Sequence, residues 1–341
     1  METDPAPSAP PARRLRAVAA ALGPLLALAL VWVGFGLLEH RLQGTPFLDS
    51  AIFSREAVAQ VVQQSVVIGI AAIGMTFVIV PAGIDLSAGS AIALASVVAA
   101  KLAAAGHGAA VVVLGTLAAG GTVGLLTGLL VVRAGLIPFI TTLGTLLVLR
   151  GIALGLADSQ PINIQEVGWL RFWLNGLPPG WEWLVLPPGG WLMLALGGLA
   201  AAVLRHTVLG RHVVAVGSSE AAARLCGVPV GRIKLAVYAL GGTCAALAGL
   251  MLASNQGQGD PTAAAGYELD VIAAVVIGGA SLSGGAGSVL GSLVGALVMT
   301  VIRVGCGLNG IDEGTTRVVT GVIIVAAVLV DRLRRPAGGA A

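Results

Sequence analysis

Residues 57–80 read AVAQVVQQSVVIGIAAIGMTFVIV and contain no charged side chain. As a helix rising about 1.5 Å per residue, such a run is long enough to cross a bilayer hydrocarbon core of about 30 Å. The run therefore predicts a transmembrane helix, and the rest of the chain decides whether it stands alone.

The composition of the whole 341-residue chain extends this interpretation. The residues Ala, Val, Ile, Leu, Met, Phe, Trp, Tyr and Cys make up 57% of it, and 50 further residues are Gly. Charged residues make up 10%, against about 25% in a typical soluble domain, and the mean hydropathy is +0.96. Too little polar surface remains to cover a water-soluble globule. The sequence predicts an all-α, polytopic integral membrane protein.

Further apolar runs lie on both sides of residues 57–80 and predict further spans, at 17–38, 89–105, 109–132, 136–157, 189–204, 235–253 and 317–330. The first run follows Arg13, Arg14 and Arg16, as the apolar region of a signal peptide would. It is longer than the usual 7–15 residues of such a region, so we interpret it as an uncleaved span.

Residues 271–302 are also apolar, but the glycine-rich segment 281–287 interrupts them. They form either one long pass or two short segments, each spanning or re-entrant. Two segments place most basic residues in cytoplasmic loops, as the positive-inside rule requires. These residues are Arg13, Arg14, Arg16, Arg133, Arg205, Arg211, Arg224, Arg232, Lys234, Arg332, Arg334 and Arg335. We therefore expect about ten membrane segments with both termini in the cytoplasm.

This topology predicts one permease-like domain over residues 17–331, between cytoplasmic tails at 1–16 and 332–341. Short, glycine-interrupted segments are typical of irregular helices around a transport site, although a plain tight turn remains an alternative. The frame G-x-x-L-S-x-G occurs at 83–89 and again at 279–285. In a chain this rich in glycine, chance is a serious alternative to an internal repeat.

Motifs for catalysis or for binding nucleotides are missing from the sequence. It has no P-loop, no HExxH and no G-x-S-x-G, and its His and Cys residues show no ligand spacing. We expect no enzyme activity, no metal, no cofactor in this chain and no nucleic-acid partner. A transporter of this kind needs energy from another subunit.

The loop 205–234 is rich in basic residues and contains signals for a short helix. Ser218 or Ser219 can cap a helix over 220–226, with Glu220 near its positive end. Gly227 suits a left-handed position at the end of that helix. Such an element can fit a groove on another protein, or it can be a simple solvated helix.

The chain resembles a known family in this loop and in motifs along the membrane region. Glu220-Ala221-Ala222 with Gly227 is similar to the coupling loop of ATP-binding-cassette importer permeases. Other matching motifs are Ile73-Gly74-Met75-Thr76, 83–90, Ile137-Pro138-Phe139-Ile140, 142–144, Arg150-Gly151, Pro261-Thr262, 266–270 and 278–287. Over residues 50–333 the sequence resembles the ribose, xylose and arabinose permeases of the branched-chain amino acid/monosaccharide superfamily.

The resemblance implies the transmembrane subunit of a bacterial importer in the inner membrane, which receives a monosaccharide from a periplasmic binding protein. It also implies a second permease chain and two ATPase subunits, which bind ATP and Mg²⁺. The residues of this chain that the resemblance implies for coupling to the ATPase are Glu220, Ala221, Ala222, Arg224 and Gly227. Alternatives are a permease for branched-chain amino acids, nucleosides or autoinducer, or an ion-coupled secondary transporter. The last would need carboxylates inside the membrane, which the spans almost lack.

Three segments depart from the family pattern: Pro81-Ala82, the acidic 311–314 and the Trp- and Pro-rich 177–183. The second and third are expected at the outer face, where they would affect the choice of sugar and of binding protein.

Polar side chains within the spans are candidates for the translocation path. Gln60, Gln63 and Gln64 share one helical face and can line a path or bond a neighbouring helix. Thr141 and Thr145 also share a face, although bonds to their own helix are the expected role. We include Asn255 in the candidate path.

Charged and glycine residues near the span ends are candidate structural or gating groups: Gly83, Asp85, Ser87, Gly89, Glu268, Asp270, Gly284 and Gly285. We expect Asp85 to cap the segment that begins near residue 89, and Glu268 and Asp270 to lie at the positive end of the next short segment. Arg150 is the basic residue inside a span; we expect a structural anchor, with Asp158 as one candidate partner.

Overall fold

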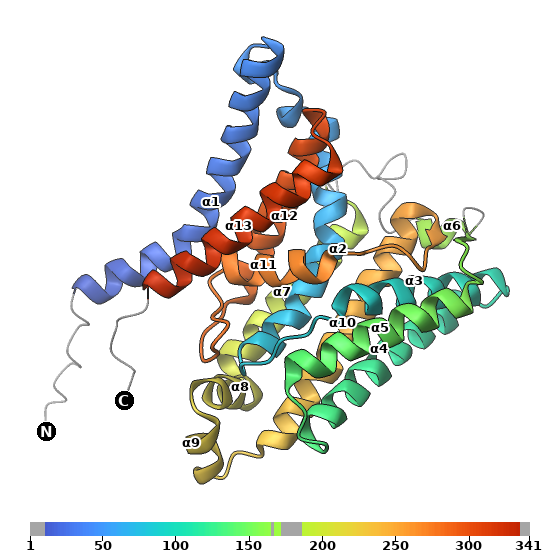
Figure 1. The fold of residues 1–341 in the computed structure, drawn as a ribbon, viewed down its shortest axis with the longest axis vertical. Helices are drawn as coiled ribbons and strands as arrows, with labels where there is room; N and C mark the ends of the chain where they lie inside the picture. The colour runs from blue at the N-terminus through green and yellow to red at the C-terminus, as the bar shows by residue number, and fades with distance from the viewer. Residues whose placement is uncertain (1–10, 165–166, 172–185, 335–341) are drawn as a thin grey trace, which may run out of the picture.

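The computed structural model describes residues 11–164, 167–171 and 186–334 and is almost entirely helical (Figure 1). The α-helices are α1 (Pro11–Gln43), α2 (Arg55–Ile79), α3 (Ala88–Ala104), α4 (Ala109–Val132), α5 (Pro138–Leu156), α6 (Gly168–Arg171), α7 (Pro188–His206), α8 (Val208–Ser218), α9 (Glu220–Leu225), α10 (Val230–Gln256), α11 (Tyr267–Ile277), α12 (Val289–Leu308) and α13 (Glu313–Arg334). The short 3₁₀ helices η1 (Phe47–Asp49) and η2 (Ala51–Phe53) precede α2, and β1 (Ile162–Asn163) pairs antiparallel with β2 (Gln258–Gly259).

Seven helices of the described part are long and apolar enough to cross a membrane: the Leu22–Gln43 part of α1 together with α2, α4, α5, α7, α10 and α12. Helix α3 has 17 residues and α11 has 11, so each is short for a full pass. Every run that the sequence marks as a membrane segment coincides with a helix. The all-α, polytopic membrane fold is confirmed.

Helices α2 and α10 form the centre of the molecule, and α3, α4 and α12 pack around them (Figure 1). The side chains of α2 and α10 are mostly buried, whereas α4 and α5 expose large apolar residues such as Leu114 and Leu147. Exposed leucines on a helix of this hydropathy suit contact with lipid. Glycines allow the central helices to approach closely: a Cβ on Gly120 of α4 would lie 2.4 Å from the carbonyl oxygen of Gly242 in α10.

The interrupted region 271–302 consists of two helices, so the single long pass is excluded. Helices α11 and α12 run antiparallel against each other: a Cβ on Gly278 would lie 2.4 Å from the backbone of Gly291, and one on Gly295 would lie 1.9 Å from the carbonyl oxygen of Ala274. The connection is longer than the tight turn considered as an alternative. Gly279, Gly284 and Gly285 all take positive φ in it, which glycine adopts without strain.

Helix α8 lies inside the expected loop 205–234, and α10 begins at Val230 rather than near residue 235. The hydroxyl of Thr207 caps α8 by accepting a bond from the Gly210 amide at 3.2 Å. The loop is therefore mostly helical, with α8 and α9 joined at Ser219. The Trp- and Pro-rich stretch 177–183 lies outside the described residues, as do residues 1–10 and 335–341 of the two tails.

Candidate functional site

The candidate coupling element consists of α8 and α9. Helix α9 has the local geometry that the sequence predicts. Ser219 is the N-cap, and its side chain accepts a bond from the Ala222 amide at 3.3 Å. Glu220 occupies the first turn, and Gly227 follows the helix with φ +78°. The amide of Val228 bonds the Ala223 carbonyl at 3.0 Å and closes the C-terminal turn. These bonds give a helix this short a defined shape.

Glu220 forms two ion pairs, one of which ties α9 to α10. Its carboxylate accepts from Lys234, at the start of α10, at 2.6 Å and from Arg224, one turn along α9, at 2.5 Å. The hydrogen bond from Lys234, and then the one from Arg224, lower the pKa of Glu220 below its ordinary value. The carboxylate is therefore ionised at neutral pH, when both pairs form.

The opposite side of α9 is free of these pairs and exposed. Ala221, Ala222 and Leu225 lie at spacings of three and four residues, so they share one face. Leu225 is 91% exposed, and both alanines are exposed as well. A small-residue face with one protruding leucine is a shape that fits a groove on another protein.

The candidate gating glycines lie where chain segments meet. A Cβ on Gly89, at the start of α3, would lie 2.1 Å from a carboxylate oxygen of Glu268 and 2.7 Å from the carbonyl of Ala264. A Cβ on Gly83 would lie 2.7 Å from the carbonyl oxygen of Val78. Both positions exclude a side chain, which explains the glycines of the first G-x-x-L-S-x-G frame.

Asp85 lies before α3, as expected, but it does not bond the helix interior. Its carboxylate accepts from the amide of Ser87 at 2.8 Å and from the Ser87 hydroxyl at 2.5 Å. Ser87 is the N-cap residue of α3. The expected cap is therefore corrected: Asp85 orders the turn that leads into α3, because both of its bonds go to the N-cap residue Ser87 rather than to an amide of the helix.

The candidate path residues are spread over separate helices. Gln63 and Gln64 are half-buried on α2, while Gln60 is exposed, and Asn255 is half-buried near the end of α10. Thr141 bonds the Ile137 carbonyl at 3.0 Å and Thr145 bonds the Thr141 carbonyl at 2.9 Å, which confirms the intrahelical role. Helix α5 packs on α3 and α4 whereas α2 packs on α10 and α12, so these residues do not gather into one site within one chain.

Arg150 is an anchor, but its partner is the backbone. Its guanidinium donates to the carbonyls of Pro261 at 2.7 Å and Ala263 at 2.8 Å. The prediction of Asp158 as partner is wrong: that residue is exposed just after α5, with φ +49°. Arg150 therefore holds the 260–266 loop, which leads into α11, against α5.

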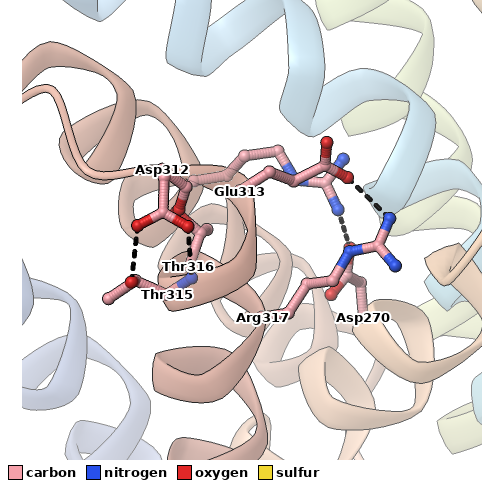
Figure 2. A network of polar contacts seen from close by, with 7 residues as sticks. Asp270, Asp312, Glu313, Thr315, Thr316 and Arg317 are labelled. Atoms are coloured by element: carbon pink, nitrogen blue, oxygen red, sulfur yellow. Dashed lines mark hydrogen bonds and ion pairs between the residues drawn. The ribbon is translucent and has the colours of Figure 1, made fainter.

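At the other end of the molecule from α9, ionic side chains of α11, α12 and α13 gather around a cavity of about 490 Å³. Asp270 and Glu268 lie in the first turn of α11, as expected. Asp270 also pairs with Arg303 of α12, whose guanidinium lies 4.5 Å from the centre of the Tyr267 ring. Figure 2 shows Asp270 beside the Glu313–Arg317 pair of α13, which is 2.6 Å long.

Two contacts in this structure had no counterpart in the sequence analysis. One is the Asp270–Arg303 pair, which joins residues 33 positions apart. The other is a buried hydrogen bond from Thr76 of α2 to Ser292 of α12 at 2.8 Å. Neither has a local sequence signal, because both depend on which helices pack together. Among the described residues, no group of three or more His, Cys, Asp or Glu side chains could hold a metal ion.

Comparison with known proteins gives a family and several close relatives. Residues 57–328 match the family model described as "Branched-chain amino acid transport system / permease component". The ribose import permease protein RbsC of Escherichia coli K12 is 40% identical over 291 residues, covering 84% of this chain and 89% of that protein. The fructose import permease protein FrcC of Rhizobium meliloti is 35% identical over 314 residues, covering 91% and 84%.

The L-arabinose ABC transporter permease protein AraH of Azospirillum brasilense is 37% identical over 268 residues, covering 79% of this chain and 77% of that protein. No solved structure gives a significant match. The family model covers most of the chain and the membrane helices from α2 to α12, and the three relatives align with 79–91% of the chain. The chain therefore belongs to the branched-chain amino acid transport system permease family and is a multi-pass membrane permease, a transport subunit rather than an enzyme.

Proposed function

We propose that this chain is the permease subunit of a bacterial ATP-binding-cassette importer for a monosaccharide such as ribose, xylose or a related sugar. The observation that carries the proposal is the 35–40% identity to permeases named for ribose, arabinose and fructose, which extends over most of the membrane region. Permeases of such importers act with a separate ATPase, which binds ATP, and with a substrate-binding protein.

The proposed assembly contains two permease chains, two cytoplasmic ATPase subunits and one periplasmic sugar-binding protein. The exposed face of α9, with Leu225 at its end, is the proposed contact with the ATPase. Residues 17–331 form the permease domain in this proposal, between short cytoplasmic tails. The bacterial inner membrane is the proposed location.

Both termini and α9 lie in the cytoplasm in the proposed topology. The arrangement of the helices supports it: in Figure 1 the start of α1, the end of α13 and α9 lie toward the left, and α6 lies toward the right. Basic residues of the described chain near α9 include Arg211, Arg224 and Lys234. Positive charge at the cytoplasmic face is what the positive-inside rule expects.

In the proposed mechanism, ATP-driven closure of the ATPase dimer displaces α9 and switches the permease between outward and inward access. A displacement changes the equilibrium only if α9 contacts the ATPase differently in the two states. The ion pair between Glu220 and Lys234 connects α9 to α10. The glutamines of α2 and Asn255 of α10 are proposed to contribute to the sugar path, which the second permease chain completes.

Uptake of radiolabelled sugars into proteoliposomes tests the proposal. The permease, its ATPase and its binding protein are reconstituted with ATP inside, and ribose, xylose and leucine are compared. We expect ATP-dependent uptake of a sugar and none from an ion gradient alone. Uptake of leucine in place of sugars would favour the branched-chain amino acid alternative, which the family description names. Uptake by the permease alone, driven by ions, would contradict ATP coupling.

A further inference from the structure

The C-terminal turn of α8 is in direct contact with two interruptions of the membrane helices. A Cβ on Gly217 would lie 1.8 Å from the carbonyl oxygen of Val80 and 2.5 Å from the amide nitrogen of Gly285. The same amide of Gly285 donates to the Val80 carbonyl at 2.8 Å. These three residues form a contact between main chains, which we call the glycine joint.

Neighbouring positions extend the joint on each side. A Cβ on Gly284 would lie 2.8 Å from the carbonyl oxygen of Gly217 and 3.0 Å from the amide of Ala82. A Cβ on Gly285 would lie 2.9 Å from the hydroxyl of Ser218. Contacts under 3.0 Å with main-chain atoms leave no space for even one methyl group, so the absence of side chains is required at Gly217 and Gly284.

The glycine at position 217 is costly for α8 itself. Gly217 is the second-to-last residue of α8 and does not take positive φ, so it is not the left-handed end of the helix, and alanine has the higher helix propensity. The packing reason is the contact with Val80 and Gly285. A role confined to α8 would favour alanine at this position.

The joint connects the coupling element to both interrupted regions. Gly217 lies three residues before Glu220, the first residue of α9. Val80 follows α2 and leads into the frame at 83–89, while Gly285 ends the frame at 279–285 between α11 and α12. The second copy of G-x-x-L-S-x-G therefore meets α8 and the 80–82 turn, which leads directly into the first copy. Main-chain contacts at close packing distance leave little freedom for side-chain adjustment, and tightly packed interiors transmit displacement.

We propose that the glycine joint is the transmission contact of the permease: α8, the 80–83 turn and the 284–285 turn move as one body when α9 is displaced. Gly217 is then a positioning residue, which acts through Val80 and Gly285 on α2 and on the α11–α12 break. This inference rests on the proposed function as an ATP-driven importer and adds the route from α9 into the membrane.

The test compares Gly217→Ala with Gly198→Ala in the reconstituted importer. Gly198 lies in α7, and a Cβ there meets nothing within 4 Å, so the control makes the same chemical change without a contact. For Gly217→Ala we expect normal assembly with the ATPase and normal basal ATP hydrolysis, but about tenfold less sugar transported per ATP. Gly198→Ala should match the wild type.

The outcome separates this inference from the proposed function. If the wild-type importer does not transport sugar with ATP, the proposed function is wrong. If the wild type transports and Gly217→Ala retains the wild-type ratio of sugar to ATP, the glycine joint is not the transmission contact.

A second measurement avoids dependence on how Gly217→Ala folds. Spin labels are placed by Arg211→Cys in α8 and Ala286→Cys beside the joint, both exposed, in a chain without native cysteines. The reference pair joins Arg211→Cys to Asp158→Cys after α5. We expect the 211–286 distance to remain constant between nucleotide-free and ATP-bound importer while the 211–158 distance changes. A change in the 211–286 distance would overturn the inference.

Discussion

The two ends of the molecule are held together by different kinds of contact. At the end that carries α9, main chains meet directly at the glycine joint, and the ion pairs of Glu220 lie at the surface. At the opposite end, charged side chains from α11, α12 and α13 gather around a cavity, and the Asp270 side chain is 8% exposed. The difference predicts that charge substitutions destabilise the second end, while added side-chain volume affects coupling at the first.

The largest effect on stability is expected from Asp270→Asn. The variant leaves the Arg303 guanidinium, 36% exposed, without its carboxylate. Because solvent screens that charge in part, the cost lies between the roughly 0–1 kcal/mol of an exposed pair and the roughly 3–5 kcal/mol of a buried one. Thermal unfolding in detergent should show a clearly lower midpoint than the wild type.

The matched control is Glu313→Gln, which removes a carboxylate from the same cavity. Glu313 and Arg317 are 80% and 72% exposed, so their pair contributes about 0–1 kcal/mol. The two variants should therefore differ clearly in unfolding midpoint. Equal midpoints would mean that burial does not distinguish the two pairs.

The next effect is expected from Gly227→Val in the turn after α9. A β-branched residue at φ +78° costs on the order of 1 kcal/mol or more and distorts the end of α9. Sugar transport and stimulation of the ATPase by the binding protein should both be lost. Insertion and affinity for the binding protein should remain, since that site is about 30 Å away across the membrane. Normal stimulation in this variant would show that α9 does not transmit the signal.

The smallest effect is expected from Glu220→Gln, which removes both exposed pairs of α9. At pH 7 the loss should be about 0.5 kcal/mol, seen as about twofold faster amide hydrogen exchange over 222–226. Because Lys234 and Arg224 lower the pKa of Glu220, the stabilisation is complete above the ordinary value of 4.5 and is lost as the pH falls through the lowered pKa. The variant should therefore show no loss of protection on acidification. Identical exchange at pH 7 would mean that the pairs do not stabilise α9.

Local features of the fold followed from the sequence because their causes lie within a few residues. The apolar runs, the Ser219 cap, Glu220 in the first turn and the left-handed Gly227 all depend on neighbours along the chain. The positive-inside rule also favoured two segments in 271–302, and α11 and α12 confirm that division.

Features that depend on packing between distant segments did not follow from the sequence. The partner of Arg150 is a pair of carbonyls more than a hundred residues away, not the nearby Asp158. The Asp270–Arg303 pair and the glycine joint likewise require knowledge of which helices touch. The repeated G-x-x-L-S-x-G frame was visible, but only the structure shows that the second copy packs on α8 and on the turn just before the first copy.

The most direct test of the account asks whether α9 is the cytoplasmic surface that binds the ATPase. The wild-type chain supplies a probe, because Cys226 after α9 is exposed while Cys244 is half-buried and Cys306 is buried. A membrane-impermeant maleimide is applied to inverted vesicles and to right-side-out vesicles, with and without the ATPase, and Cys226→Ser serves as control. The account predicts labelling of Cys226 in inverted vesicles alone and its protection by the bound ATPase. Labelling in right-side-out vesicles, or equal labelling with and without the ATPase, would contradict it.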